Sequence, residues 1–349
     1  MSHELEIVDG IAAMVWTKEK PWHGLGIEMD PKAGAHEWMK SAQLDWDVIK
    51  IPTTVTLPNG ATLDVLGAKG TPYSTLVRDH GNSKFAQEDV FGPVGPEWEP
   101  VQNSEVFDFL HRFTKSGKMT METCGSLKGG TEIWALIKFA DNFEIAKGDE
   151  MTGYLLFHSC HVWGKGNVIK LTPVRVVCNN TLAMSLRDGN TSFRMPHTRA
   201  FDDEVQKSAI QALGLANDQM DTFKAVAEVL STTRAKDEDV QEFIASIYQP
   251  KKLAELRAEN DNLQMAPASD IFTPTSENVW EAIHLAPGAD LKSSKGTWWG
   301  AFNGVTYMED HLKISFKDPG NVLQSAWFGG GAKRKEQALD MALVYAQAS

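Results

Sequence analysis

Histidine and cysteine gather at one point of the chain, in the run His158-Ser159-Cys160-His161. Imidazole nitrogen and thiolate sulfur are ligands that zinc prefers, so this run raises the question of a metal site. The flanking residues predict a strand, in which His158 and Cys160 share one face and His161 points away from it. Since the three side chains do not converge easily and no CxxC pair accompanies them, we expect a structural role, no metal and no other cofactor.

Cys178 could act as a nucleophile if a base and an orienting group lay beside it. Cys178 and Cys160 could lie on adjacent strands near His161, although only the predicted topology brings them together. A buried free cysteine usually behaves as a small apolar residue. We therefore predict no catalytic residue. An enzyme that processes nucleic acid or nucleotides, with His158, His161 and Cys178 near its site, stays open as an alternative.

Basic residues concentrate in the middle of the chain, although the whole chain carries a formal charge of −12. Between positions 161 and 200 there are six lysine and arginine residues and one acid, Asp188. Between positions 201 and 290 there are seventeen acidic and seven basic residues. This asymmetry predicts an anion-binding surface next to an acidic section that keeps the protein in solution or binds a partner. Ordinary variation of surface charge is the alternative.

The basic residues of the central segment can hold a phosphodiester backbone without reading bases. A second basic group follows three glycines near the C-terminus, at the start of a predicted helix, where a bound anion would relieve the helix dipole. The spacing of a nucleotide-binding phosphate loop is missing there. We predict base stacking on Trp163 and Phe193. The predicted backbone contacts are Lys165, Lys170, Arg175, Arg187, Arg194, His197, Arg199, Lys333, Arg334 and Lys335.

The stretch from Leu171 to Leu186 is expected to position these side chains. Val174, Val176 and Cys178 alternate as in a half-buried strand, with Arg175 on the opposite side. Asn179 and Asn180 then predict a turn that caps a helix. We interpret this junction of strand and helix as the functional centre.

The remaining pattern predicts an α+β fold, an antiparallel sheet with helices packed on one face, in which three strands and a helix form the core. Asn59-Gly60 between two extended runs predicts a hairpin. After position 201 the pattern becomes mainly helical, with separate helices over 203–213 and 218–230. We expect an α+β core domain over 1–200, an acidic helical section over 201–264 and a C-terminal helical section over 276–349.

Composition limits the class of protein. The chain has 349 residues, 42% of them hydrophobic, and its apolar runs are too short to span a membrane. The N-terminus lacks the apolar stretch of a signal peptide, and three cysteines make no disulfide framework. These features predict a cytoplasmic protein. Large apolar residues near the C-terminus (Trp327, Phe328, Leu339, Leu343 and Tyr345) predict docking on the main domain or on a second copy, so we expect a homo-oligomer.

Several blocks resemble, in order, an uncharacterised family of phage and plasmid proteins. The blocks are PWHGLG, TPVRVVCNNTL, HT at 197–198, GTWWGAFNGVTYMEDH and WFGGGAKRKEQALDMA. In its order of elements alone, the chain is also similar to phage single-strand annealing recombination proteins. That resemblance implies an oligomeric ring or filament that binds single-stranded DNA by its backbone, needs no nucleotide and acts in the bacterial cytoplasm.

Our leading hypothesis from the sequence is a non-enzymatic protein of a mobile element that binds single-stranded DNA as a homo-oligomer and promotes strand annealing. Besides the enzyme named above, one more alternative is open. The acidic helical section could mimic DNA charge and block a host or phage protein partner, as an anti-defence protein does. Affinity for DNA at several salt concentrations separates these hypotheses, because backbone binding weakens steeply as salt rises.

Overall fold

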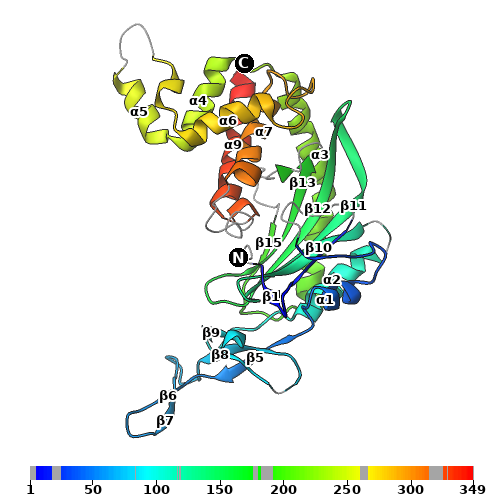
Figure 1. Ribbon diagram of the computed structural model, residues 1–349, viewed down its shortest axis with the longest axis vertical. Coiled ribbons are helices and arrows are strands. Elements are labelled where there is room, and N and C mark those ends of the chain that lie inside the picture. Colours follow the sequence, from blue (N-terminus) through cyan, green and yellow to red (C-terminus); the bar gives the residue numbers. More distant parts are fainter. Residues whose placement is uncertain are drawn as a thin grey trace. The chain divides into compact units, whose positions relative to one another are not determined.

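A sheet of eight strands is the largest element of the computed structural model, which describes residues 5–17, 25–82, 84–115, 117, 119–175, 180–181, 192–259, 266–313, 325–327 and 329–348. The strands follow the order β14-β13-β12-β11-β10-β3-β4, and β15 pairs with β13 (Figure 1). The bounds are β3 (Met14–Trp16), β4 (Ile27–Glu28), β10 (Met119–Leu127), β11 (Glu132–Ala146), β12 (Asp149–Cys160), β13 (Asn167–Arg175), β14 (Asn180–Thr181) and β15 (Ser192–Met195).

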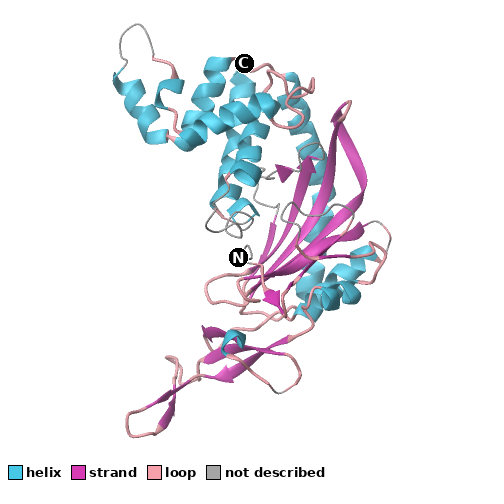
Figure 2. Ribbon diagram, viewed as in Figure 1, coloured by secondary structure: helices cyan, strands magenta, loops and turns pink. Residues whose placement is uncertain are grey.

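The chain divides into two compact units that interleave in sequence. The first unit contains residues 1–140, 155–170 and 192–213, and the second contains 141–154, 171–191 and 214–349. This division differs from the three continuous sections expected from the sequence, because the outer ends of β11 and β12 group with the helices. The predicted α+β class with a helical C-terminal section is confirmed (Figure 2).

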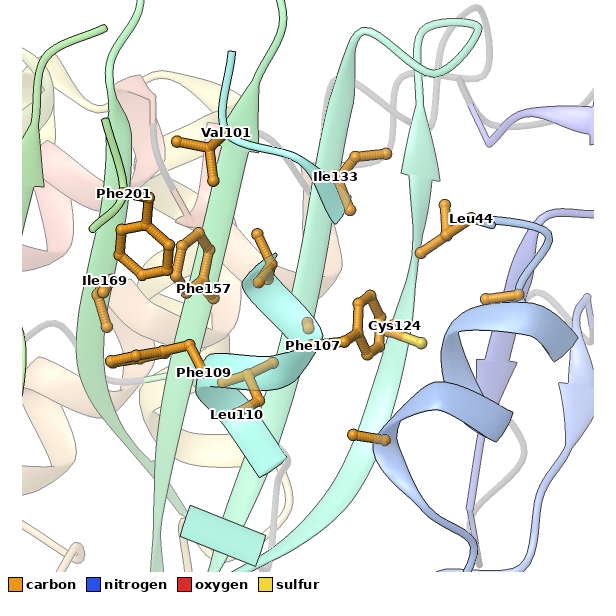
Figure 3. Packing of buried hydrophobic residues seen from close by; sticks show 14 of the residues in the cluster. Leu44, Val101, Phe107, Phe109, Leu110, Cys124, Ile133, Phe157, Ile169 and Phe201 are labelled. Carbon is orange, nitrogen blue, oxygen red and sulfur yellow. The ribbon is translucent and has the colours of Figure 1, made fainter. Parts of the chain in front are cut away.

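Two helices cover one face of the sheet in the first unit, α1 (Ala35–Ser41) and α2 (Asn103–Thr114). From β11, the alternate residues Ile133, Ala135 and Ile137 belong to the same core cluster, as expected when one strand face is buried. Figure 3 shows Phe109 of α2 close to Phe157 of β12 and to Phe201. The ring centroids of these three phenylalanines lie 5.4–5.9 Å apart, a separation typical of edge-to-face pairs.

A smaller sheet and two hairpins complete the first unit. The smaller sheet contains β5 (Asp47–Pro52), β8 (Ser74–Asp79) and β9 (Val90–Val94), with the short helix η1 (Gln87–Asp89) before β9. The hairpin predicted at Asn59-Gly60 is confirmed. It joins β6 (Thr54–Thr56) to β7 (Thr62–Asp64), and Gly60 has a φ of 82°, which favours glycine. The other hairpin joins β1 (Ile7–Val8) to β2 (Ile11–Ala12).

The second unit is mainly helical. Its helices, and the one that leads into it, are α3 (Asp203–Thr232), α4 (Asp237–Tyr248), α5 (Pro250–Glu259), η2 (Ala268–Ile271), α6 (Pro274–Leu285), α7 (Trp298–Tyr307), η3 (Met308–Leu312) and α9 (Gly330–Ala348). Helices α6 and α7 approach closely at Gly304, where an added Cβ would come within 2.3 Å of Ile283 Cγ1. Among the residues that the structure describes, no helix has the length and apolar character that crossing a bilayer requires.

Two local predictions from the sequence are wrong. The residues expected to form separate helices over 203–213 and 218–230 form one continuous helix, α3. The junction chosen as the functional centre is also different, because Asn180 and Thr181 form β14 and pair antiparallel with the end of β13. Val176, Cys178 and Asn179, and the helix predicted beyond them, lie outside the described residues.

Candidate functional site

The turn between β10 and β11 is where buried charged groups of the first unit meet. Lys128, Gly129 and Gly130 all have left-handed backbones, with φ values of 54°, 64° and 86°. An added Cβ at Gly130 would come within 2.8 Å of Arg78 Nη2, so a side chain there would displace the guanidinium. Arg78 Nη2 also donates to the carbonyl of Gly129 at 2.6 Å. The turn therefore links the charged residues of β8 with those of β11.

Glu132 begins β11 and is only 1% exposed. Its Oε2 lies 3.1 Å from Nε2 of His158, and its Oε1 accepts from Lys165 Nζ at 2.5 Å and from Lys128 Nζ at 3.1 Å. Burial alone would raise the pKa of Glu132. The hydrogen bonds from His158, Lys165 and Lys128 outweigh burial and hold this pKa well below its usual range. Glu132 is therefore a buried carboxylate that stays ionised.

Cys160 completes a compact set of donors with Glu132 and His158. Its Sγ lies 3.6 Å from both ring nitrogens of His158, and one ligand atom from each of the three residues lies within 4.8 Å of the other two. Burial, followed by the nearby charge of Glu132, raises the pKa of the Cys160 thiol to about 12. The thiol is therefore protonated at neutral pH in this arrangement, which disfavours its use as a nucleophile.

Arg78 forms a second buried charged group next to the same turn. The guanidinium pairs with Glu6 through Nη1 and lies 3.5 Å from Asp89 Oδ1 through Nε. It also lies 5.0 Å from the ring centroid of Trp46 and 5.5 Å from that of Phe91, within the range of cation–π attraction. Two carboxylates and two aromatic rings thus hold one buried arginine, an arrangement that ties the smaller sheet to the N-terminal segment.

His161 lies among apolar rings instead of with His158 and Cys160. It stacks on Phe91 at 5.8 Å and meets Trp46 edge-on at 5.6 Å. Neither of its ring nitrogens has a hydrogen-bond partner in the part of the chain that the structure describes. Burial, followed by electrostatic interaction with His197 and Arg78, lowers its pKa to about 3. The predicted divergence of His161 from His158 and Cys160 is confirmed.

Some of the residues predicted to bind nucleic acid lie on one strand face or in exposed loops, and others are buried in the core. The register of β13 with β15 places Arg194 opposite Val168 and Ser192 opposite Lys170. Lys170 and Arg194 therefore share one face of the strand pair, while Ile169 and Met195 lie in the core behind it. Trp163, in the loop that leads to β13, is 74% exposed. Arg199 is exposed and lies 3.8 Å from Glu204.

Two of the predicted contacts in the central segment need correction. His197 is buried and stacks on Trp98 at 3.9 Å, with its Nδ1 at 3.0 Å from the carbonyl of Glu99. Burial lowers the pKa of His197, so a cationic role at the surface is wrong. Phe193 shares the face of Ile169 and packs against the core, so it is not a free surface for a base.

The basic group near the C-terminus is also different from the prediction. Lys335 is 2% exposed and pairs with Asp310 at 2.7 Å, so its predicted contact with phosphate is wrong. Arg334 lies 3.4 Å from Glu309, and Lys333 is exposed. The acids of η3 therefore compensate the charge that the sequence assigned to a bound anion. Arg187 and the side chain of Arg175 lie outside the described residues.

The apolar residues near the C-terminus dock within their own chain. Leu339 is completely buried, and Tyr345 stacks on Trp298 at 4.9 Å. The helices that α9 packs against, α4 and α7, belong to the helical sections predicted over 201–264 and 276–349, so this docking differs from the predicted docking on the main domain. Phe328 lies outside the described residues. Tyr345 thus has its aromatic partners, Phe243 of α4 and Trp298 of α7, within its own chain, and this contact does not require a second copy.

Sequence reasoning missed Glu132, Arg78, Glu6 and Asp89. A signal was available for two of them. Glu132 precedes the apolar run IWALI, and Arg78 follows the buried residues Leu76 and Val77. A charged residue attached to an apolar strand is seldom buried unless it is paired. Nothing in the sequence identifies the partners, because they come from distant parts of the chain.

Comparison with known proteins identifies a family whose description names no function. No curated protein and no solved structure matches the chain. One family model, described as Domain of unknown function (DUF932), matches residues 90–342. The match includes Glu132, His158 and Cys160, whereas Glu6 and Arg78 precede it. Because the match covers well over half of the 349 residues, the chain belongs to the DUF932 family.

Proposed function

We propose that this protein binds single-stranded DNA through the phosphate backbone, on the face formed by β13 and β15. The observation that supports the proposal is the register that puts Lys170 and Arg194 on the same face of this strand pair. In such a pair, diagonal neighbours lie roughly 7–8 Å apart, so both cations can contact one phosphodiester chain.

The loop between β12 and β13 adds a surface on which a base can stack. Trp163 is 74% exposed, and Gly166, three residues later, packs against the carbonyl of Met195, next to Arg194. An aromatic side chain beside cations that contact the backbone is the usual arrangement for single strands bound without sequence preference. Lys165 in this loop contributes less, because its ammonium group already pairs with Glu132.

The resemblance to phage and plasmid proteins gives this proposal its context. We propose a role in a mobile element, in which binding of single strands as a homo-oligomer promotes their annealing. Neither step requires a nucleotide. Light scattering with and without an oligonucleotide tests the assembly, and a monomer under both conditions would exclude annealing as an oligomer.

Fluorescence anisotropy of a labelled single-stranded oligonucleotide tests DNA binding by the full chain over a series of salt concentrations. The logarithm of the affinity should fall linearly with the logarithm of salt concentration, by about 0.7 for each phosphate contact. Arg194→Ala should reduce this slope by about 0.7 and weaken binding to all sequences about equally. Trp163→Ala should weaken binding by about 1–3 kcal/mol.

Arg112→Ala is the matched control for Arg194→Ala. Arg112 is a half-exposed arginine of the same unit that lies on α2 and pairs with Asp203 at 3.3 Å. Its replacement removes the same charge and should leave both the affinity and the salt slope unchanged. Equal effects of the two variants would indicate general attraction without a binding face, and no affinity at low salt would contradict the proposal.

A further inference from the structure

Three potential metal ligands converge in the first unit from two neighbouring strands. Glu132 begins β11, and His158 and Cys160 lie near the end of β12. One ligand atom from each of them lies within 4.8 Å of the other two. His158 and Cys160 share a strand face, and the pairing of β11 with β12 supplies the third donor that their own strand lacks.

Neighbouring side chains hold these ligands in place. Glu132 and Cys160 are each 1% exposed, and His158 is 5% exposed. The backbone N–H of Cys160 donates to Asn167 Oδ1 at 3.1 Å, and the same oxygen accepts from Ser159 Oγ at 3.0 Å. A metal site benefits from such support, because ligands that are already oriented lose little freedom when an ion binds.

The two oxygens of Glu132 have different partners. Oε1 accepts from Lys165 and Lys128, whereas Oε2 lies toward His158. An ion could therefore replace the hydrogen bond between Glu132 Oε2 and His158, while the lysines keep the carboxylate oriented through Oε1. Hydrogen bonds from residues outside the ligand set commonly orient metal-binding carboxylates in this way.

We propose that Glu132, His158 and Cys160 bind a divalent transition-metal ion, and that zinc is the best match. A sulfur, an imidazole nitrogen and a carboxylate oxygen together suit zinc better than magnesium or calcium, which prefer oxygen ligands alone. On binding, the Cys160 thiol transfers its proton to solvent, and His158 coordinates as neutral imidazole with its proton on the other ring nitrogen. Three protein ligands leave a fourth position that a water molecule can fill.

Lys128 and Lys165 carry positive charges that oppose a second cation nearby. Their side chains are 29% and 44% exposed, so solvent screens both ammonium groups. The ionised ligands, one carboxylate and one thiolate, balance the two charges of the metal. This inference does not depend on DNA binding, because it uses no residue of the face formed by β13 and β15.

Cobalt titration of the full chain, stripped of metal by a chelator, tests the site. Co²⁺ bound to a thiolate shows a charge-transfer absorption in the near ultraviolet, and zinc should displace it. We expect saturation at about one Co²⁺ per chain, as for a single site of this kind. Cys160→Ser should abolish the absorption and weaken metal binding at least about 10-fold, because loss of even a residue that only supports a ligand typically costs that much.

Cys124→Ser is the matched control, because Cys124 is also completely buried but lies in the core cluster beneath α1, with its sulfur 3.9 Å from the carbonyl of Trp38. With Co²⁺ bound, the Cys124→Ser variant should show the same absorption as the unmodified protein, and so should Cys178→Ser. The proposal is overturned if the unmodified protein shows no absorption, or if the absorption survives in Cys160→Ser. The absorption of the unmodified protein is measured without any variant, so the proposal can still be overturned if a variant misfolds.

Discussion

Glu132 in the first unit and Glu309 in the second are both buried carboxylates, and each residue is only 1% exposed. Glu309 accepts from Tyr248 Oη at 3.0 Å and from Lys313 Nζ at 2.8 Å, and it lies 3.4 Å from Arg334 Nη1. Glu132 has a comparable set of donors in His158, Lys165 and Lys128. In burial and hydrogen bonding, the two sites are therefore close equivalents.

The difference lies in which donors surround each carboxylate. The donors around Glu309 are Tyr248, Lys313 and Arg334, whose side chains zinc rarely uses as ligands. Burial, followed by the charge of Glu309, raises the pKa of the Tyr248 phenol, so this hydroxyl keeps its proton. Around Glu132, by contrast, the imidazole of His158 and the sulfur of Cys160 are groups that zinc commonly uses as ligands. Burial of an ion pair by itself is thus a weak sign of function, and the chemical type of the partners carries more information.

The Glu309 site has a structural role that its neighbours make clear. Next to it, Asp310 pairs with Lys335, so two successive acids of η3 hold two successive bases of α9. Both ion pairs attach α9 to η3. We expect substitutions there to change stability alone, whereas substitutions around Glu132 should also change metal binding.

The largest effect should follow from Lys335→Met, which keeps the volume of the side chain and removes its charge. Asp310, with a side chain only 6% exposed, would be left as a buried charge without this partner. Breaking a buried pair in this way typically costs about 3–5 kcal/mol. Urea denaturation measures the loss. Lys333→Met, at an exposed position two residues earlier, is the control and should change the free energy of unfolding by less than about 0.5 kcal/mol.

A smaller effect is expected for Glu132→Gln in metal-free protein. The amide keeps the shape of the side chain and can still accept hydrogen bonds, and the partly exposed Lys128 and Lys165 can turn toward solvent. We expect a loss of about 1–3 kcal/mol in the free energy of unfolding, again from urea denaturation.

Zinc sharpens this test. At a concentration about 100 times its Kd, a ligand stabilises the folded state by about 2.7 kcal/mol. Zinc should therefore stabilise the unmodified protein and Glu309→Gln by similar amounts, and Glu132→Gln by much less. Equal stabilisation of all three proteins would make the two buried carboxylates equivalent and remove the distinction drawn between them.

The sequence predicted the parts of this site that depend on local geometry. The alternation of a strand put His158 and Cys160 on one face and His161 on the other, and the structure agrees. The Asn59-Gly60 hairpin and the α+β class were also predictable, because turn chemistry and periodicity are properties of short segments.

Long-range pairing could not be predicted in the same way. Glu132 meets His158 only because β11 and β12 pair in one register, and a shift of one residue would turn each side chain to the other face. Glu6 reaches Arg78 across 72 positions of sequence. Lys335 looked like a solvated base at a helix start, since nothing local showed that η3 places Asp310 beside it.

Lys165→Ala should have the smallest effect on stability and separates the two roles that this residue could have. Its ammonium group pairs with Glu132, but the lysine side chain is 44% exposed, and in the variant Glu132 keeps its other two partners, His158 and Lys128. We therefore expect a change of less than about 1 kcal/mol in the free energy of unfolding, well below that of Lys335→Met. Because the ammonium group of Lys165 already pairs with Glu132, it contributes little to a contact with phosphate. The salt slope of DNA binding should therefore fall less in Lys165→Ala than in Arg194→Ala. A slope reduced as much as in Arg194→Ala would instead indicate that DNA draws Lys165 away from Glu132, and the buried carboxylate and the DNA-binding face would then form one coupled site.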